Sequence, residues 1–69
     1  MNSDILQGKW TEVKGKVKKQ WGKLTDDDIA KINGSREELE GKIQKTYGYQ
    51  KERAKKEIDD FITTNHLDD

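Results

Sequence analysis

The chain has 69 residues, which is enough for one domain with one small core. Charged residues make up 41% of it and hydrophobic residues only 29%, a balance that approaches that of disordered chains. Because the formal net charge is zero, self-repulsion does not force the chain apart, and the periodicity of its apolar residues decides whether it folds.

The composition excludes several kinds of site. Cysteine is absent, so there is no disulfide framework, thiolate zinc site or thiol nucleophile. The single histidine, His66, stands near the C-terminus, where a solvated side chain is far more common than a metal ligand. The start of the chain lacks the pattern of a signal peptide, and no apolar run approaches the roughly 18 residues that span a bilayer. We expect a cytoplasmic protein without metal, cofactor or stable membrane insertion.

The N-terminal third of the chain predicts one long helix. Its apolar residues advance in steps of three and four, which is the pattern of one helical face. Ser3 is the expected N-cap and Gly22 the expected end. The residues of this apolar stripe are Leu6, Trp10, Val13, Val17, Trp21 and Leu24.

A short second helix is predicted after Thr25. This hydroxyl precedes three acids, Asp26 to Asp28, and Asp28 stands where the acid of a capping box stands. Ile29 and Ile32 give the helix its apolar contact. Asn33 and Gly34 tolerate the left-handed conformation in which helices end.

Two further helices complete the prediction. Ser35 and Glu38 form a second capping-box pattern, which opens a helix that Gly48 closes. The last helix is expected from about Gln50 to Thr63, with a weak N-cap because Tyr49 offers no short side-chain acceptor. The apolar positions of these two helices are Leu39, Ile43 and Tyr47, and then Ala54, Ile58, Phe61 and Ile62.

The charges and the missing strand signals both favour an all-α domain over residues 1–69. Proline is absent, and no β-branched alternation or hairpin pattern separates the helices. Each predicted helix also carries one acid-first pair at i,i+4 spacing, a pattern that adds roughly 0.2–0.5 kcal/mol per pair. The four pairs are Glu12/Lys16, Asp27/Lys31, Glu38/Lys42 and Glu52/Lys56.

An internal repeat indicates how the four helices pack. GKVKKQWG, residues 15–22, matches GKIQKTYG, residues 41–48, at an offset of 26, and each half of the chain reads as a helical hairpin. The repeat places Trp21 over Tyr47 as core rings whose polar groups reach solvent. It also places Gly15 over Gly41, and an interior helix glycine costs about 1 kcal/mol relative to alanine. We expect close backbone approach between the hairpins to offset that cost.

Two long segments of the chain point to a known family. WTEVKGKVKKQWGKLTDDD, followed by GKIQKTYGYQKERAKKEIDDF, resembles the CsbD-like family of small bacterial stress-response proteins, including its YjbJ-type members. The resemblance implies a compact helical domain of two hairpins, similar to the sterile-alpha-motif arrangement, made in the cytoplasm under general stress. It brings no catalytic site, cofactor or ligand, so it implies no functional residue.

The residue inventory argues against an enzyme. Nucleophilic catalysis needs a nucleophile beside a base and an orienting group, and the hydroxyls here mostly stand at helix starts. The acids Asp26, Asp27 and Asp28 lack the alternating ligands and the turn glycine of a calcium loop, so helix capping is the favoured interpretation.

Nucleic-acid binding is the alternative function, because charge is segregated along the chain. Residues 1–24 carry six lysines and two acids, whereas residues 57–69 carry five acids and no Lys or Arg. Lysines without arginine forks give weak, salt-sensitive contacts, so a merely solvated basic face is the competing interpretation. The candidate phosphate-facing residues are Lys14, Lys16, Lys18, Lys42 and Lys45.

A third possibility is that the first helix, with Trp10 and Trp21, docks on an anionic membrane or in the groove of a partner. Its apolar face is needed for the core, however, so docking would require the domain to open. We therefore expect a monomeric stress-response protein that acts by stoichiometric interaction with partners such as client proteins, or protects them, without catalysis.

Overall fold

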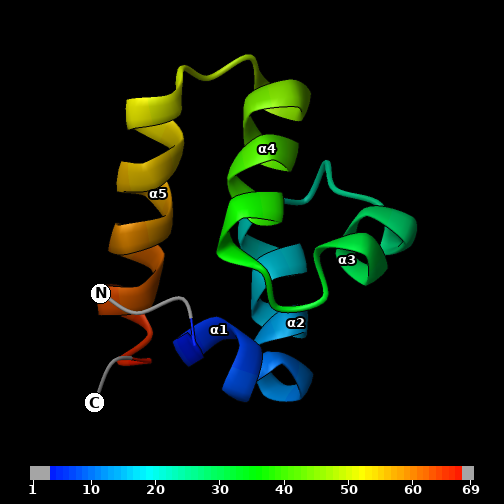
Figure 1. Ribbon diagram of the computed structural model, residues 1–69, viewed down its shortest axis with the longest axis vertical. Coiled ribbons are helices and arrows are strands. Elements are labelled where there is room, and N and C mark those ends of the chain that lie inside the picture. Colours follow the sequence, from blue (N-terminus) through cyan, green and yellow to red (C-terminus); the bar gives the residue numbers. More distant parts are fainter. Residues whose placement is uncertain (1–3, 68–69) are drawn as a thin grey trace.

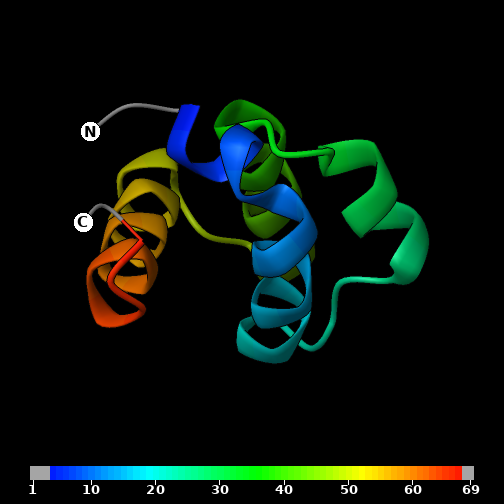
Figure 2. The same cartoon turned by 90° about the horizontal axis from the view of Figure 1, so that it is seen from below.

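The computed structural model describes residues 4–67 and shows five α-helices and no strand within that range. In Figures 1 and 2, α5 and α3 lie on opposite sides of the pair formed by α2 and α4. The all-helical class is therefore confirmed. The helices are α1 (Asp4–Gly8), α2 (Trp10–Gln20), α3 (Asp26–Ile32), α4 (Arg36–Tyr47) and α5 (Lys51–Thr64).

The prediction of one long N-terminal helix is wrong, because the chain breaks at Lys9 into α1 and α2. Lys9 has φ −113° and ψ 16°, and its Nζ donates a hydrogen bond to the carbonyl oxygen of Leu67 at 3.2 Å. Gly8 precedes the break and lowers the cost of leaving the helix there. The expected N-cap, Ser3, lies outside the described residues. At the other end α2 stops at Gln20, slightly before the predicted Gly22.

The predicted starts of α3 and α4 are confirmed. The Thr25 hydroxyl accepts a hydrogen bond from the Asp28 N–H at 3.1 Å, and the Asp28 carboxylate accepts one from the Thr25 N–H at 3.0 Å. These two bonds form the capping box that the sequence predicted. The Ser35 hydroxyl likewise accepts from the Glu38 N–H at 3.3 Å. Helix α5 begins after Gln50 without a side-chain cap, as its weak N-cap pattern indicated.

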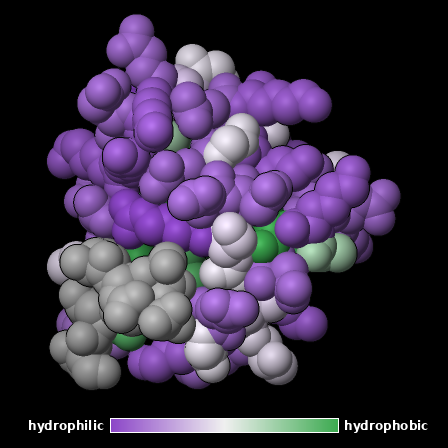
Figure 3. Space-filling model, in the orientation of Figure 1, coloured by the Kyte–Doolittle hydropathy of each residue, from purple (hydrophilic) through white to green (hydrophobic). Residues whose placement is uncertain are grey.

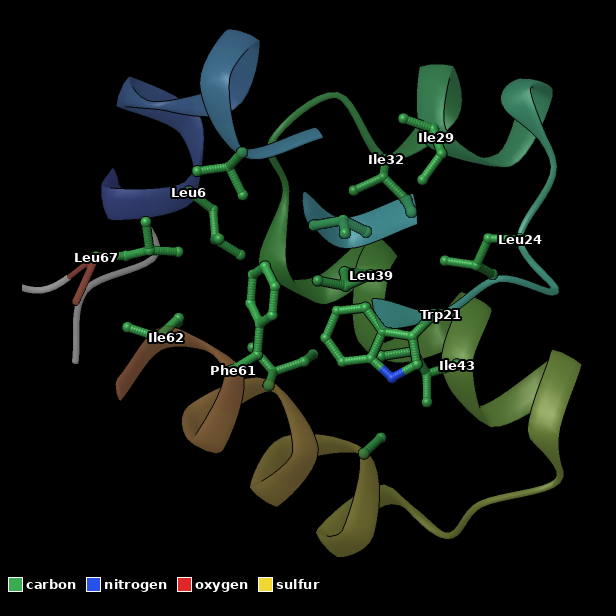
Figure 4. Close-up of a cluster of buried hydrophobic side chains, with 14 residues drawn as sticks. Leu6, Trp21, Leu24, Ile29, Ile32, Leu39, Ile43, Phe61, Ile62 and Leu67 are labelled. Atoms are coloured by element: carbon green, nitrogen blue, oxygen red, sulfur yellow. The ribbon is translucent and has the colours of Figure 1, made fainter. Parts of the chain in front are cut away.

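The core collects the predicted apolar stripes between the helices (Figure 4). The rings of Trp21 and Phe61 lie at its centre, with centroids 5.0 Å apart. The expectation that the Trp21 N–H reaches solvent is wrong, because Nε1 is buried and has no hydrogen-bond partner among the described residues. The buried residues are Leu6, Val13, Val17, Trp21, Leu24, Ile29, Ile32, Leu39, Ile43, Ala54, Ile58, Phe61, Ile62 and Leu67.

The expected close approach at Gly15 and Gly41 is also wrong. A Cβ added at either position meets no atom of the described residues within 4 Å. The close approach occurs at Gly34 instead, where φ is +84° and a Cβ would lie 2.8 Å from the Cα of Gln7. Gly34 therefore lets α1 pack on the turn between α3 and α4.

The ion pairs of the described residues are not the four predicted i,i+4 pairs. Lys42 contacts Asp28, on another helix, and Lys56 contacts Asp60 rather than Glu52. Arg36 contacts both Glu40 and Asp59. The i,i+4 spacing brings side chains within reach, but exposed pairs gain so little that other acids compete, on a neighbouring helix for Lys42 and on the same helix for Lys56. Within residues 4–67, no helix has the length and apolar character needed to cross a bilayer.

Candidate functional site

The five candidate lysines lie around three different hollows of the surface. Lys14 and Lys18 line a groove between α2 and α3. Lys16 lies two residues from each of them, about 200° around the helix, and lines a hollow beside Phe61. Lys42 and Lys45 line a shallow hollow on α4. The fold thus brings Lys14 to Lys18 and Lys42 to Lys45, but it does not gather the five lysines around one hollow.

The acids at the start of α3 engage two of these lysines. The Nζ of Lys18 contacts Oδ1 of Asp26, and the Nζ of Lys42 lies 3.5 Å from Oδ1 of Asp28. The hydrogen bond from the Thr25 N–H, assisted by the Thr25 hydroxyl and Lys42, lowers the pKa of Asp28 against an opposing desolvation effect. Lys14, Lys16 and Lys45 make no ion pair with any described residue.

The groove between α2 and α3 has a volume of about 640 Å³ and is named the Gly15 groove. Two small residues, Gly15 and Ala30, face it from the two helices. Trp10, which is partly buried and packs on the core, lines it as well. The complete lining is Trp10, Thr11, Lys14, Gly15 and Lys18 from α2, with Asp26, Ile29, Ala30 and Asn33 from α3 and the residue that follows it.

A second groove, of about 670 Å³, runs between α4 and α5 and is named the Gly41 groove. Arg36 bridges the two helices there: Nε donates to Glu40 at 3.0 Å and Nη2 donates to Asp59 at 2.7 Å. Burial opposes the charge of Arg36, but the hydrogen bonds to Asp59 and Glu40 outweigh it and raise the pKa of the guanidinium. The lining is Arg36, Glu37, Glu40, Gly41, Gln44, Lys51, Lys55 and Asp59.

The two grooves draw on corresponding positions of the chain. Seven lining positions of the Gly15 groove match lining positions of the Gly41 groove when 26 is added to the residue number. The sequence placed Gly15 over Gly41, but it gave no sign that either glycine borders a groove. The matching pairs are Trp10 and Arg36, Thr11 and Glu37, Lys14 and Glu40, Gly15 and Gly41, Lys18 and Gln44, Ile29 and Lys55, and Asn33 and Asp59.

An aromatic stack that the sequence reasoning missed joins two connecting segments. The rings of Tyr47 and Tyr49 are stacked with centroids 5.5 Å apart, and the guanidinium of Arg53 lies 4.1 Å from the Tyr49 centroid. The Lys23 N–H donates to the Tyr47 hydroxyl at 3.3 Å. The i,i+4 spacing of Tyr49 and Arg53 was the one available signal. The Nζ of Lys23 also lies 5.4 Å from the Tyr47 centroid, so Lys23 contacts the stack through both its backbone and its side chain.

Among residues 4–67, no group of three or more His, Cys, Asp and Glu side chains is placed to hold a metal ion. The candidate binding sites of the described residues are thus two grooves and several charged helix surfaces. These features define a small all-helical protein built around one core, with its candidate binding positions on the surface.

The chain belongs to the CsbD-like family, whose model matches residues 4–56. It is 58% identical over 65 residues to UPF0337 protein YjbJ of Escherichia coli K12, covering 94% of each chain. The Salmonella typhimurium YjbJ is 56% identical over 66 residues, covering 96% of this chain and 94% of that one. UPF0337 protein PA4738 of Pseudomonas aeruginosa is 52% identical over 61 residues, covering 88% of this chain and 94% of that one.

Proposed function

We propose that the protein acts in the general stress response by stoichiometric interaction with other proteins, which it protects, and that it is not an enzyme. The observation that carries this proposal is the division between core and surface. The apolar stripes of the described helices are buried, while hydrophilic residues cover most of the face in Figure 3. Such a hydrophilic surface, on a chain with 41% charged residues, favours weak and reversible electrostatic contacts with other molecules.

The displaced pKa values of Asp28 and Arg36 argue against a catalytic role for these two groups. The pKa of Asp28 is lowered and that of Arg36 is raised, and hydrogen bonds that cap or join helices produce both shifts. Both displacements move the pKa away from neutrality, whereas general acid–base catalysis needs a pKa near the working pH. These groups therefore have structural roles.

The finer features of the proposal are a cytoplasmic location, a monomeric state and a single domain over residues 1–69 with two hairpins related by an internal repeat. The correspondence between the two groove linings supports the repeat and the hairpins. The high identity to YjbJ over nearly the whole of both chains supports a shared single-domain organisation. Membership of the CsbD-like family, whose members are small bacterial stress-response proteins, supports a role in the general stress response.

A client-protection assay tests the proposal. An aggregation-prone enzyme is heated or dried alone, with this protein, or with an inert protein at the same mass concentration. We expect less light scattering and more residual client activity with this protein than with the inert control. Equal aggregation in the two mixtures contradicts a protective role.

Weak, nonspecific nucleic-acid binding is the second candidate, and the exposed side of α2 is the observation that favours it. This helix exposes Lys14, Lys16, Lys18 and Lys19, of which only Lys18 has an acidic partner among the described residues. A mobility-shift assay at about 50 mM salt, where phosphate contacts are strongest, tests this candidate. We expect a shift that weakens when Lys16 and Lys18, or Lys42 and Lys45, are changed to Gln. An absent shift at high micromolar protein rules it out.

A further inference from the structure

We propose that the Gly15 groove docks an acidic amphipathic helix of a partner protein. This inference rests on the proposed stoichiometric function and names the class of partner and the surface that takes it. Three observations carry it: an unpacked glycine, a difference between the two corresponding grooves, and the arrangement of lysines and apolar atoms around the first of them.

Gly15 has no structural explanation within the described residues. It lies inside α2, where glycine destabilises a helix relative to alanine, and a Cβ there would meet nothing within 4 Å. Gly15 is exposed and lines the groove, as does the small, exposed residue Ala30 of α3. A glycine in such a position allows another chain to approach the helix closely, and any larger side chain would occupy that space.

In the Gly41 groove a charged side chain bridges the two helices. There Arg36 crosses from α4 to Asp59 on α5, and its side chain also holds the buried Glu40. The positions that correspond to Arg36 and Asp59 are Trp10 and Asn33, which make no such bridge. The contact between Lys18 and Asp26 crosses one end of the Gly15 groove, but no ion pair joins Trp10 to Asn33, so that part of the groove keeps a partly apolar wall where Arg36 bridges the Gly41 groove.

The charges around the Gly15 groove select an acidic occupant. Lys14 and Lys18 lie one helical turn apart on its α2 side, so they match carboxylates spaced i,i+4 on a docked helix. Lys14 makes no ion pair with a described residue, whereas the Nζ of Lys18 contacts Asp26, so a carboxylate of the docked helix would have to share or displace that contact. Trp10 and Ala30 supply apolar contact for the same helix.

The dimensions and the chemistry fit a helix better than the other anionic partners. The α2 wall runs from Trp10 to Lys18, about 12 Å at 1.5 Å per residue, or roughly two helical turns. A phosphate backbone would leave the apolar wall of Trp10, Ile29 and Ala30 unused. A second copy of this chain lacks the required element, because the apolar stripes of its described helices are already buried in the core.

The test uses a pair of synthetic helices as probes. One is a peptide of about 15 residues with a leucine stripe flanked by glutamates, long enough to form helix on docking. The other has the same leucines with lysines in place of the glutamates. We expect the acidic peptide to bind at least about tenfold more tightly in a fluorescence anisotropy titration, and to shift the amide NMR signals of α2 and α3 residues around the groove.

Matched variants locate the site. Gly15→Leu fills the Gly15 groove and Gly41→Leu fills the corresponding one, and neither added side chain meets a described atom at its Cβ. We expect Gly15→Leu to weaken binding of the acidic peptide at least about tenfold while Gly41→Leu leaves it unchanged. Lys14→Gln should weaken binding more than Lys16→Gln, because Lys16 lines a different hollow. Far-UV circular dichroism checks that each variant is folded.

The outcomes separate this inference from the function on which it rests. Equal binding of the two peptides, or equal effects of Gly15→Leu and Gly41→Leu, overturns the docking site. So does a finding that anionic vesicles or single-stranded DNA shift the same NMR signals while the acidic peptide does not. The client-protection assay is run on Gly15→Leu in parallel. Protection by the wild type together with absent peptide binding refutes the groove alone, whereas absent protection by the wild type refutes the proposed function.

Discussion

Replacing Gly34 with alanine tests how α1 is held against the rest of the domain. The residue has φ +84°, and a Cβ would lie 2.8 Å from the Cα of Gln7, a backbone atom that cannot move without shifting α1. The left-handed conformation costs a non-glycine residue about 1–2 kcal/mol, and relieving the overlap adds to it. We therefore expect Gly34→Ala to lower the free energy of unfolding by about 2–3 kcal/mol, a drop in Tm on the order of 10 °C or more.

The corresponding substitutions at Gly15 and Gly41 should have the opposite sign. Both residues lie inside helices, where alanine is favoured over glycine by roughly 0.5–1 kcal/mol, and neither new methyl group meets a described atom within 4 Å. Each alanine variant should therefore be more stable than the wild type. Urea and thermal unfolding followed by circular dichroism measure all three variants. An unchanged free energy of unfolding in Gly34→Ala would refute this reasoning. So would a decrease of about 1 kcal/mol or more in the alanine variant of Gly15 or Gly41.

Three further substitutions test individual contacts. Thr25→Ala removes the capping-box hydroxyl and should cost about 1 kcal/mol in urea unfolding, whereas Thr25→Ser should restore most of it. Because its folded-state pKa is lowered, Asp28 contributes stability that is fully present above its unfolded pKa of about 3.8 and is lost as the pH falls through the folded value. The stability difference between wild type and Asp28→Asn should therefore shrink on acidification below about pH 4, and a difference independent of pH would contradict this assignment. Arg36→Ala leaves the buried Glu40 without its partner and should cost about 2–3 kcal/mol, against less than 1 kcal/mol for the exposed Lys56→Ala.

The features that the sequence predicted correctly are those that depend on neighbouring residues. The capping box of Thr25 and Asp28 needs only a hydroxyl and an acid three positions apart. The end of α4 needs only a residue that adopts a positive φ, and Gly48 has φ 73°. The apolar stripes were predicted for the same reason, because their spacing is a local property that the core then uses.

The features that the sequence missed depend on tertiary packing. Leu6 and Trp10 keep helical spacing across the break at Lys9, so the period of the apolar residues could not reveal it. The ion pair between Lys42 and Asp28 joins α4 to α3, and no spacing rule within one helix predicts it. The same holds for the grooves. The repeat identified Gly15 as unusual, but only the fold shows that it borders a groove between α2 and α3.

The dependence of client protection on molar ratio tests stoichiometric action most directly. A fixed amount of an aggregation-prone enzyme is heated with increasing amounts of this protein, and residual client activity is plotted against the ratio of the two chains. Stoichiometric interaction predicts that protection rises with the ratio and levels off on the order of one or a few molecules per client. Full protection at a small fraction of that ratio, or none at any ratio, would contradict it.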